Sequence, residues 1–273
     1  MESISVKDFS LEKTLGCGQF FRYERKEDGS YLLSLRDRLF SVRQEGSKLF
    51  FSGVPKEFVI RLFRLDEDYQ KIIKSISKDE FIRKTIKTNF GMRLMRQDPW
   101  ECLISYICSA NNNIPRIKKN LEMISRSFGK RIAHEAHKGF SFPNPGELSN
   151  YDKIRGCGVG FRSRFIHETN QTIEEGRLNS LKDRSYEEAR EELIKLKGVG
   201  DKIADCVCMF SLEKLEAFPV DVWMRRVMLE NYFKGEDPKK ISNNRIREFG
   251  REYFGRYCGY ANQFLFYYRR LQK

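Results

Sequence analysis

Lys202, Cys206 and Asp221 are the residues whose types and spacing could carry out covalent chemistry. Lys202 follows Gly200 by two positions, in what the pattern predicts to be the first turn of a helix. A positive charge is unfavourable there, because the N-terminus of a helix already carries partial positive charge. An amine that gives up its proton becomes a nucleophile, so Lys202 is a candidate for Schiff-base chemistry. The alternative is an ordinary surface lysine.

Cys206 lies one turn after Lys202 on the same predicted helical face, where its thiol could touch the amine. Asp221 follows in the segment Phe218-Pro-Val-Asp221-Val-Trp223, directly before another predicted helix. Its carboxylate could cap that helix or face a cavity, and one side chain can do both.

A hairpin of two helices must position Lys202 and Cys206, and the sequence predicts one over 185–211. Ser185 and Glu188 match a capping box at its start. Gly198 ends the first helix, and Asp201 is the expected N-cap of the second. Apolar residues lie between them at spacings of three and four, as on one face of a helix: Tyr186, Ala189, Leu193 and Leu196.

The short connection of this hairpin, Gly198-Val199-Gly200, favours contact with phosphate. Backbone N–H groups at a helix N-terminus can hold a phosphate without selecting a base. Lys195 and Lys197 precede it. The alternative is a plain turn between packed helices; we expect instead that all three connecting residues contact the DNA backbone.

The charge of the chain also points to a polyanion. Its 273 residues include 51 Lys and Arg against 38 Asp and Glu, a net charge of +13. Nucleic acid is the first candidate and an anionic membrane surface the second. Hydrophobic residues make up 40% of the chain, too many for a disordered basic tail. We expect no membrane span, because the longest apolar stretch, 102–108, is far shorter than the roughly 20 residues that cross a bilayer.

The cysteines argue against a disulfide framework and against a metal cluster. There are seven, an odd number, and no two have the C-x-x-C spacing of structural metal sites. His134 and His137 are one residue short of the HExxH spacing and are expected to be surface side chains. We therefore expect neither metal nor cofactor, and a reducing compartment inside the cell.

The order of patterns predicts an α+β fold. Short runs rich in aromatic and branched residues at 31–35, 39–43 and 48–51 indicate antiparallel strands. From Pro55 onward helical spacing takes over. We expect a small N-terminal antiparallel β domain, residues 1–65, packed on a larger all-helical body, residues 66–273, which contains the helix-hairpin-helix motif.

The motifs around Lys202 resemble the helix-hairpin-helix DNA glycosylase superfamily and, more narrowly, its 8-oxoguanine DNA glycosylases. Lys202 in the hairpin, followed by Pro219-Val-Asp221, matches the bifunctional members. The resemblance runs from about residue 10 to 268. Further matching segments are Gly18-Gln-Phe-Phe-Arg22, Leu94-Met-Arg-Gln-Asp-Pro99, Cys108-Ser-Ala-Asn-Asn-Asn-Ile-Pro-Arg116, Gly158-Val-Gly-Phe-Arg-Ser-Arg164 and Gly259-Tyr-Ala261.

This resemblance implies excision of 8-oxoguanine from duplex DNA, preferably opposite cytosine, by a monomer. Lys202 would attack the sugar C1′ and form a Schiff base that permits β-elimination, while Asp221 would stabilise cationic character at the sugar. The Gly18 carbonyl would accept a hydrogen bond from N7–H of the lesion. Cys206 and Phe266 would sandwich the flipped base, and Pro219 would line the same pocket.

The resemblance also implies contacts to the opened duplex. Asn111 would fill the space that the base leaves, Phe161 would act as an aromatic wedge, and Arg116 and Arg162 would contact the orphaned cytosine.

Two positions depart from the family pattern. Asn262, followed by Gln263, stands where the family usually has a glutamine on the Watson–Crick edge of the base, and Trp223 stands where a histidine is common. Two other functions stay open: a non-catalytic DNA-binding module, and a monofunctional alkylpurine glycosylase, which uses the aspartate without the lysine.

Overall fold

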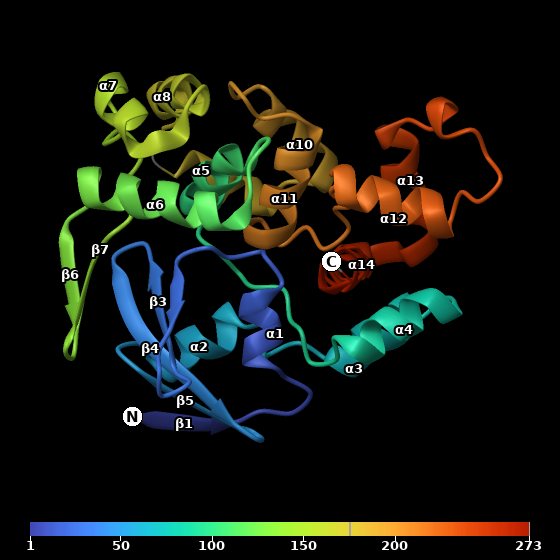
Figure 1. The fold of residues 1–273 in the computed structure, drawn as a ribbon, viewed down its shortest axis with the longest axis horizontal. Coiled ribbons are helices and arrows are strands. Elements are labelled where there is room, and N and C mark those ends of the chain that lie inside the picture. Colours follow the sequence, from blue (N-terminus) through green and yellow to red (C-terminus); the bar gives the residue numbers. More distant parts are fainter. Residues whose placement is uncertain (175, 273) are drawn as a thin grey trace.

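The first 52 residues supply a five-stranded antiparallel sheet in the computed structural model, which describes residues 1–174 and 176–272 (Figure 1). Its strand order is β1-β5-β4-β3-β2. The strands are β1 (Glu2–Ser5), β2 (Tyr23–Arg25), β3 (Tyr31–Leu35), β4 (Arg38–Glu45) and β5 (Lys48–Ser52).

Two short helices complete the core of this sheet, α1 (Leu11–Gly16) and α2 (Lys56–Leu62). Apolar side chains of both helices pack with inward-facing residues such as Phe40 and Phe51, which are almost fully buried. The three predicted strands are present, whereas β1, β2 and α1 were not predicted. They lie in stretches too short to show a period of their own.

Twelve helices make up most of the rest of the described chain, and the predicted small N-terminal β domain on a larger, mostly helical body is confirmed. They are α3 (Tyr69–Ile76), α4 (Glu80–Thr88), α5 (Pro99–Ser109), α6 (Ile114–Phe128), α7 (Tyr151–Ile154), α8 (Arg162–Thr172), α9 (Arg177–Ser180), α10 (Tyr186–Ile194), α11 (Asp201–Ser211), α12 (Val222–Asn231), α13 (Asn243–Phe254) and α14 (Cys258–Leu271), with a π-helical turn at Arg155–Val159.

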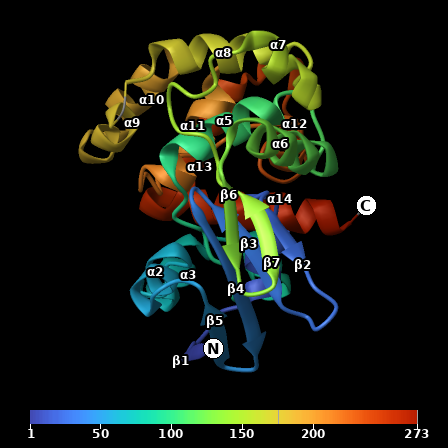
Figure 2. The same cartoon turned by 90° about the vertical axis from the view of Figure 1, so that its left-hand side faces the viewer.

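The body is not entirely helical, which corrects the prediction. Strands β6 (Arg131–His134) and β7 (His137–Phe140) form a hairpin that reaches down beside β4 (Figure 2). The His134 side chain is only 12% exposed, and its Nε2 lies 2.8 Å from Ser52 Oγ. His134 is therefore a packed contact to the sheet and not a surface residue. Four-residue strands give too little alternation to be recognised from the sequence.

A buried ion pair joins the sheet to the body. Arg22, just before β2, lies 3.2 Å from Glu101 of α5, and both side chains are less than 5% exposed. The second carboxylate oxygen of Glu101 accepts a hydrogen bond of 2.7 Å from the backbone N–H of Arg36. Burial raises the pKa of Glu101, while Arg22 acts against that rise. The pair fixes the sheet against the helix that leads to the site described below.

The helical hairpin forms where the sequence predicts it. Ser185 and Glu188 make the complete capping box of α10. The expected N-cap Asp201 is wrong: Gly200 is the N-cap of α11, and Asp201 is its first helical residue, paired with Arg190 instead. Gly200 has extended backbone angles and no side chain that could cap the helix. The first amide groups of α11 therefore have no side-chain partner from the N-cap.

The seven cysteines are all buried free thiols in this fold. Among the described residues, no helix is both long and apolar enough to cross a membrane.

Candidate active site

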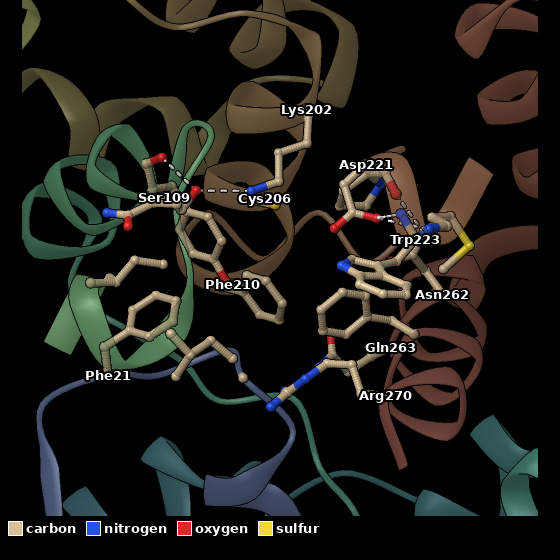
Figure 3. Close-up of a pocket in the computed structure, with 18 of the residues that line it drawn as sticks. Phe21, Ser109, Lys202, Cys206, Phe210, Asp221, Trp223, Asn262, Gln263 and Arg270 are labelled. Atoms are coloured by element: carbon tan, nitrogen blue, oxygen red, sulfur yellow. Dashed lines mark hydrogen bonds between the residues drawn. The ribbon is translucent and has the colours of Figure 1, made fainter. Parts of the chain in front are cut away.

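A cavity of about 550 Å³ lies where α5, α6, α11, α14 and the loop after α1 meet (Figure 3). This is a usual size for a small-molecule site. It is lined by every residue predicted to act on the sugar or on the base: Gly18, Lys202, Cys206, Pro219, Asp221, Asn262 and Phe266. These residues come from both ends of the sequence, so the tertiary fold alone brings them together.

Lys202 enters the cavity from the first turn of α11. Its Nζ donates a hydrogen bond of 2.9 Å to Ser109 Oγ and lies 5.0 Å from the centre of the Tyr106 ring. Ser109 and Tyr106 belong to the last turn of α5. The hydrogen bond thus holds the amine at one point of the cavity wall, and the rest of the amine borders the open cavity.

Asp221 is the N-cap of α12, as one of its two predicted roles requires. Its Oδ1 accepts hydrogen bonds from the backbone N–H groups of Trp223 and Met224, at 3.0 and 2.7 Å. The same side chain also lines the cavity, so capping and cavity roles are combined. Figure 3 shows Asp221 and Lys202 at the same end of the cavity, with Arg270 at the other.

Cys206 and Phe266 also line the cavity, from α11 and α14 respectively. Cys206 is 4% exposed, and burial raises the pKa of its thiol to about 12, while nearby Lys202 acts to lower it. At neutral pH this thiol is uncharged. It can therefore offer a soft, polarizable surface to a flat ring without adding negative charge next to the amine.

Gly18 approaches the cavity with its backbone. Its φ of 87° lies in the left-handed region, which a side chain disfavours. A Cβ built there would overlap Arg270 Nη1 and lie 2.9 Å from Ile114 Cδ1. Only glycine leaves room for a ligand to reach this backbone.

The amide groups of Asn262 and Gln263 are both turned to main-chain carbonyls. Asn262 Nδ2 donates to the carbonyl of Pro219, and Gln263 Nε2 to that of Cys17, each at 2.9 Å. Both residues line the cavity. Each amide nitrogen uses one of its two N–H groups in this bond, so the second N–H and the oxygen remain for other partners.

The residues predicted to contact the opened duplex lie outside this lining. Phe161 is 57% exposed, as a wedge requires, and Asn111 is an exposed residue with a φ of 47°. Arg116 is exposed in the first turn of α6. Arg162 is only 3% exposed and donates to the carbonyls of Ala110, Asn111 and Val159. Arg162 must leave these carbonyls before it can contact a base.

The hairpin connection, Gly198-Val199-Gly200, joins α10 to α11. Gly198 has a φ of 76°, and a Cβ there would lie 2.6 Å from Phe165 Cβ and closer still to its ring. Tyr186 and Arg190 of α10 bond the buried carboxylate of Asp205 in α11, at 2.6 and 3.0 Å. These contacts fix the angle between the two helices and the direction of the α11 N-terminus.

Comparison with known proteins agrees with this geometry. The family model for the N-terminal domain of 8-oxoguanine DNA glycosylase matches residues 3–103. A probable N-glycosylase/DNA lyase of Methanothermobacter thermautotrophicus is 31% identical, over 98% of this chain and 95% of the relative. The chain belongs to the 8-oxoguanine DNA glycosylase/lyase family.

Two solved structures of the family superpose over nearly the whole length. MBOgg1 in complex with a low-affinity DNA ligand gives a TM-score of 0.93 at 36% identity, covering 99% of this chain and 95% of that one. The Clostridium acetobutylicum 8-oxoguanine glycosylase/lyase, bound to DNA with cytosine opposite 8-oxoG, gives 0.91 at 34% identity, covering 100% and 98%. The similarity to these structures therefore extends over the sheet, the helical body and the cavity between them.

Ser109 and Arg270 are among the residues of this glycosylase site that sequence reasoning missed. Ser109 stands inside the matched Asn-Asn-Asn segment, but nothing in the sequence places it against Lys202. Arg270 lines the cavity and follows Asn262 and Phe266 at intervals of four residues. That helical spacing was the available signal, since residues four apart share a helix face.

Proposed function

We propose that this protein excises 8-oxoguanine from duplex DNA, preferably opposite cytosine, and then cuts the abasic strand by β-elimination. The observation that carries the proposal is the cavity itself. It holds an amine and a carboxylate at one end, and Cys206 and Phe266 line the same cavity, whose volume of about 550 Å³ has room for a base.

Lys202 is proposed as the nucleophile. Its unprotonated amine attacks C1′ of the flipped nucleotide, the C1′–N9 bond breaks, and the base leaves with the bonding electrons and takes up a proton. The sugar ring then opens to a protonated Schiff base. Loss of a C2′ proton expels the 3′ phosphate and so cleaves the strand. Ser109, which holds Nζ, acts as a positioning residue.

Asp221 is proposed to stabilise the cationic sugar that develops as the base departs. Its Oδ1 is fixed by two backbone N–H groups, so the carboxylate keeps one orientation throughout the reaction. A preorganised charge of this kind needs no rearrangement when the transition state forms.

Binding of the duplex is proposed to use the N-terminus of α11. Gly198, Val199 and Gly200 would present backbone N–H groups to a phosphate, since Gly200 leaves the helix start without a side-chain cap. Phe161 would wedge the stack and Asn111 would fill the vacated space. Arg116 would contact the cytosine, joined by Arg162 only if it leaves its carbonyl partners.

Several expectations accompany this proposal. The protein would act as a monomer inside the cell, because one chain supplies every proposed site residue and its seven cysteines are free thiols. The reaction needs neither metal nor cofactor, since the amine and the carboxylate provide the nucleophile and the countercharge.

The alternatives lose support from the same site. A non-catalytic binding module would not need Lys202 and Asp221 at the same end of a cavity. An alkylpurine glycosylase of the monofunctional type would need only the aspartate.

Borohydride trapping tests the proposal. The protein is incubated with a duplex that carries one 8-oxoguanine opposite cytosine, and the covalent adduct is measured. The wild type should form an adduct that Lys202→Gln does not form, while Lys195→Gln, an exposed lysine of the same hairpin, should still form it. Adduct formation by Lys202→Gln would refute the assignment of Lys202 as the nucleophile. A wild type that does not react at all would refute the proposed enzymatic activity.

A further inference from the structure

Arg270 provides the cavity with a hydrogen-bond donor that the reaction above does not use. It stands in the last turn of α14, one turn after Phe266, and its guanidinium lies 5.6 Å from the centre of that ring. Its Nη1 is buried, and among the described residues it has no hydrogen-bond partner. A buried donor without a partner costs free energy, and an acceptor that reaches this group from the cavity would offset that cost.

The position of Arg270 relative to Gly18 says which part of a base it would meet. Nη1 lies so close to Gly18 that a Cβ there would overlap it. In the proposed complex the Gly18 carbonyl accepts a hydrogen bond from N7–H of the lesion. Arg270 therefore faces the edge of the purine on which N7 lies.

That edge carries two carbonyl oxygens, O8 on one side of N7 and O6 on the other. C8 is bonded to N9, and N9 carries the sugar that Lys202 attacks, so O8 lies toward Lys202. Arg270 lies at the opposite end of the cavity from Lys202 (Figure 3). The oxygen within its reach is consequently O6.

Arg270 is the charged donor beside Gly18, whereas Asn262 and Gln263 each direct one of their two N–H groups to a main-chain carbonyl. We propose that Arg270 donates a hydrogen bond to O6 of the flipped base, and so selects oxidised purines with a 6-oxo group over those with a 6-amino group. The inference rests on the proposed function and adds a residue to its specificity.

A 6-amino purine would bring a donor against this donor. The guanidinium cannot give up its proton or act as an acceptor, so it cannot adapt to an amino group. Adenine-derived lesions are thus disfavoured at the same position that holds guanine-derived ones. Rejection by an unpaired buried polar group is a strong form of discrimination.

Affinities measured in a Lys202→Gln background test the assignment, because this background prevents excision. Duplexes carry 8-oxoguanine, 8-oxoadenine or undamaged guanine opposite cytosine. Arg270→Leu should weaken binding of the 8-oxoguanine duplex by roughly 10-fold or more, as loss of a hydrogen bond to a charged group predicts. Binding of the 8-oxoadenine duplex should stay the same or tighten, because 8-oxoadenine has no O6 and its 6-amino group meets the guanidinium as a second donor. The undamaged guanine has O6 but lacks N7–H, so its duplex is the reference for binding without the Gly18 contact.

Two further variants separate specificity from structure. Arg270→Lys keeps a donor and should recover part of the preference for 8-oxoguanine. Arg269→Leu removes the neighbouring cation, which pairs with Glu230 at 3.0 Å, and should leave the preference unchanged. Melting temperatures of all variants are compared with the parent.

Equal losses on both lesions, or an unchanged ratio between them, would overturn the role of Arg270. Excision of 8-oxoguanine by the wild type is measured first. If the wild type excises the lesion and the ratio does not respond to Arg270, only the specificity assignment fails. If the wild type does not excise it, the proposed function fails and this inference fails with it.

Discussion

Lys202 and Ser109 form a chain of two hydrogen bonds that ends on the backbone of α5. The amine donates to the Ser109 hydroxyl at 2.9 Å, and that hydroxyl donates to the carbonyl of Tyr106 at 2.7 Å. Because its own proton is directed to Tyr106, Ser109 can only accept from the amine. These two hydrogen bonds fix the position of Lys202 Nζ and leave the rest of the amine directed at the cavity.

Ser109→Ala should therefore slow base excision without abolishing it. Loss of one hydrogen bond to the amine predicts a decrease in the single-turnover rate of about threefold to tenfold, with DNA affinity nearly unchanged. Ser77→Ala removes a hydroxyl that likewise donates to a helix carbonyl, but outside the cavity lining, and serves as the control. A rate equal to that of the wild type would show that Ser109 does not position the amine.

Asp221→Asn separates the charge of this residue from its capping role. Asparagine keeps an oxygen for the N–H groups of Trp223 and Met224, so the free energy of unfolding should change by less than about 1 kcal/mol. The rate of excision should fall by 100-fold or more, in the order of other lost electrostatic groups. Asp68→Asn, at the N-cap of α3, is the matched control. Equal losses in turnover and lesion affinity would indicate capping alone.

Preference for cytosine opposite the lesion should depend on Arg116 more than on Arg162. Arg116 is exposed, whereas the Arg162 guanidinium is held by the carbonyls of Ala110 and Asn111. Arg116→Ala should bring excision rates opposite cytosine and adenine closer together. Arg162→Ala should lower both rates alike and lower the melting temperature, because the Asn111 loop loses its support. Comparable rates opposite both bases in the wild type would contradict the preference itself.

Alkaline pH should destabilise the fold through its buried thiols. Burial raises the pKa of Cys17 to about 11 and of Cys108 to about 12, from an ordinary value of 9.0. Above pH 9 the thiols of the unfolded chain ionise first, so the unfolded state gains and stability falls until the folded-state pKa is passed. The melting temperature, measured with a reductant, should decline between pH 9 and 11.

Cys108→Ala provides the control for that decline. It removes one of the thiols, and each contributes a slope of at most about 1.4 kcal/mol per pH unit, so the variant should lose stability less steeply. Identical pH profiles for the variant and the parent would exclude Cys108 as a source of the effect.

Much of the proposed chemistry was predictable because the residues that position it are close together in the sequence. The capping box of Ser185 and Glu188 and the cap at Asp221 depend on residues two or three positions apart. Lys202 and Cys206 share a helix face because they are four apart. The predicted N-cap of α11, Asp201, was wrong by one residue, because Gly200 adopts the extended backbone that the cap position needs.

Contacts between distant segments were beyond the reach of such patterns. The β6–β7 hairpin is defined by its packing on β4 and Ser52, and Arg162 by the carbonyls of a loop about 50 residues earlier. Nothing in the spacing of the sequence encodes these neighbours, because they come from packing and not from helical or strand periodicity.

The sequence by itself determined which residues could react and on which helices they stand: Lys202, Asp221 and the glycines that open α11. Only the tertiary structure decided what surrounds them. It brought Gly18 and Arg270, from opposite ends of the chain, against the same cavity. It also placed the Ser109 hydroxyl within hydrogen-bond distance of the Lys202 amine. Local hydrogen bonds and periodicity fix a residue's place on its own helix, whereas a cavity forms only when separate helices pack around it.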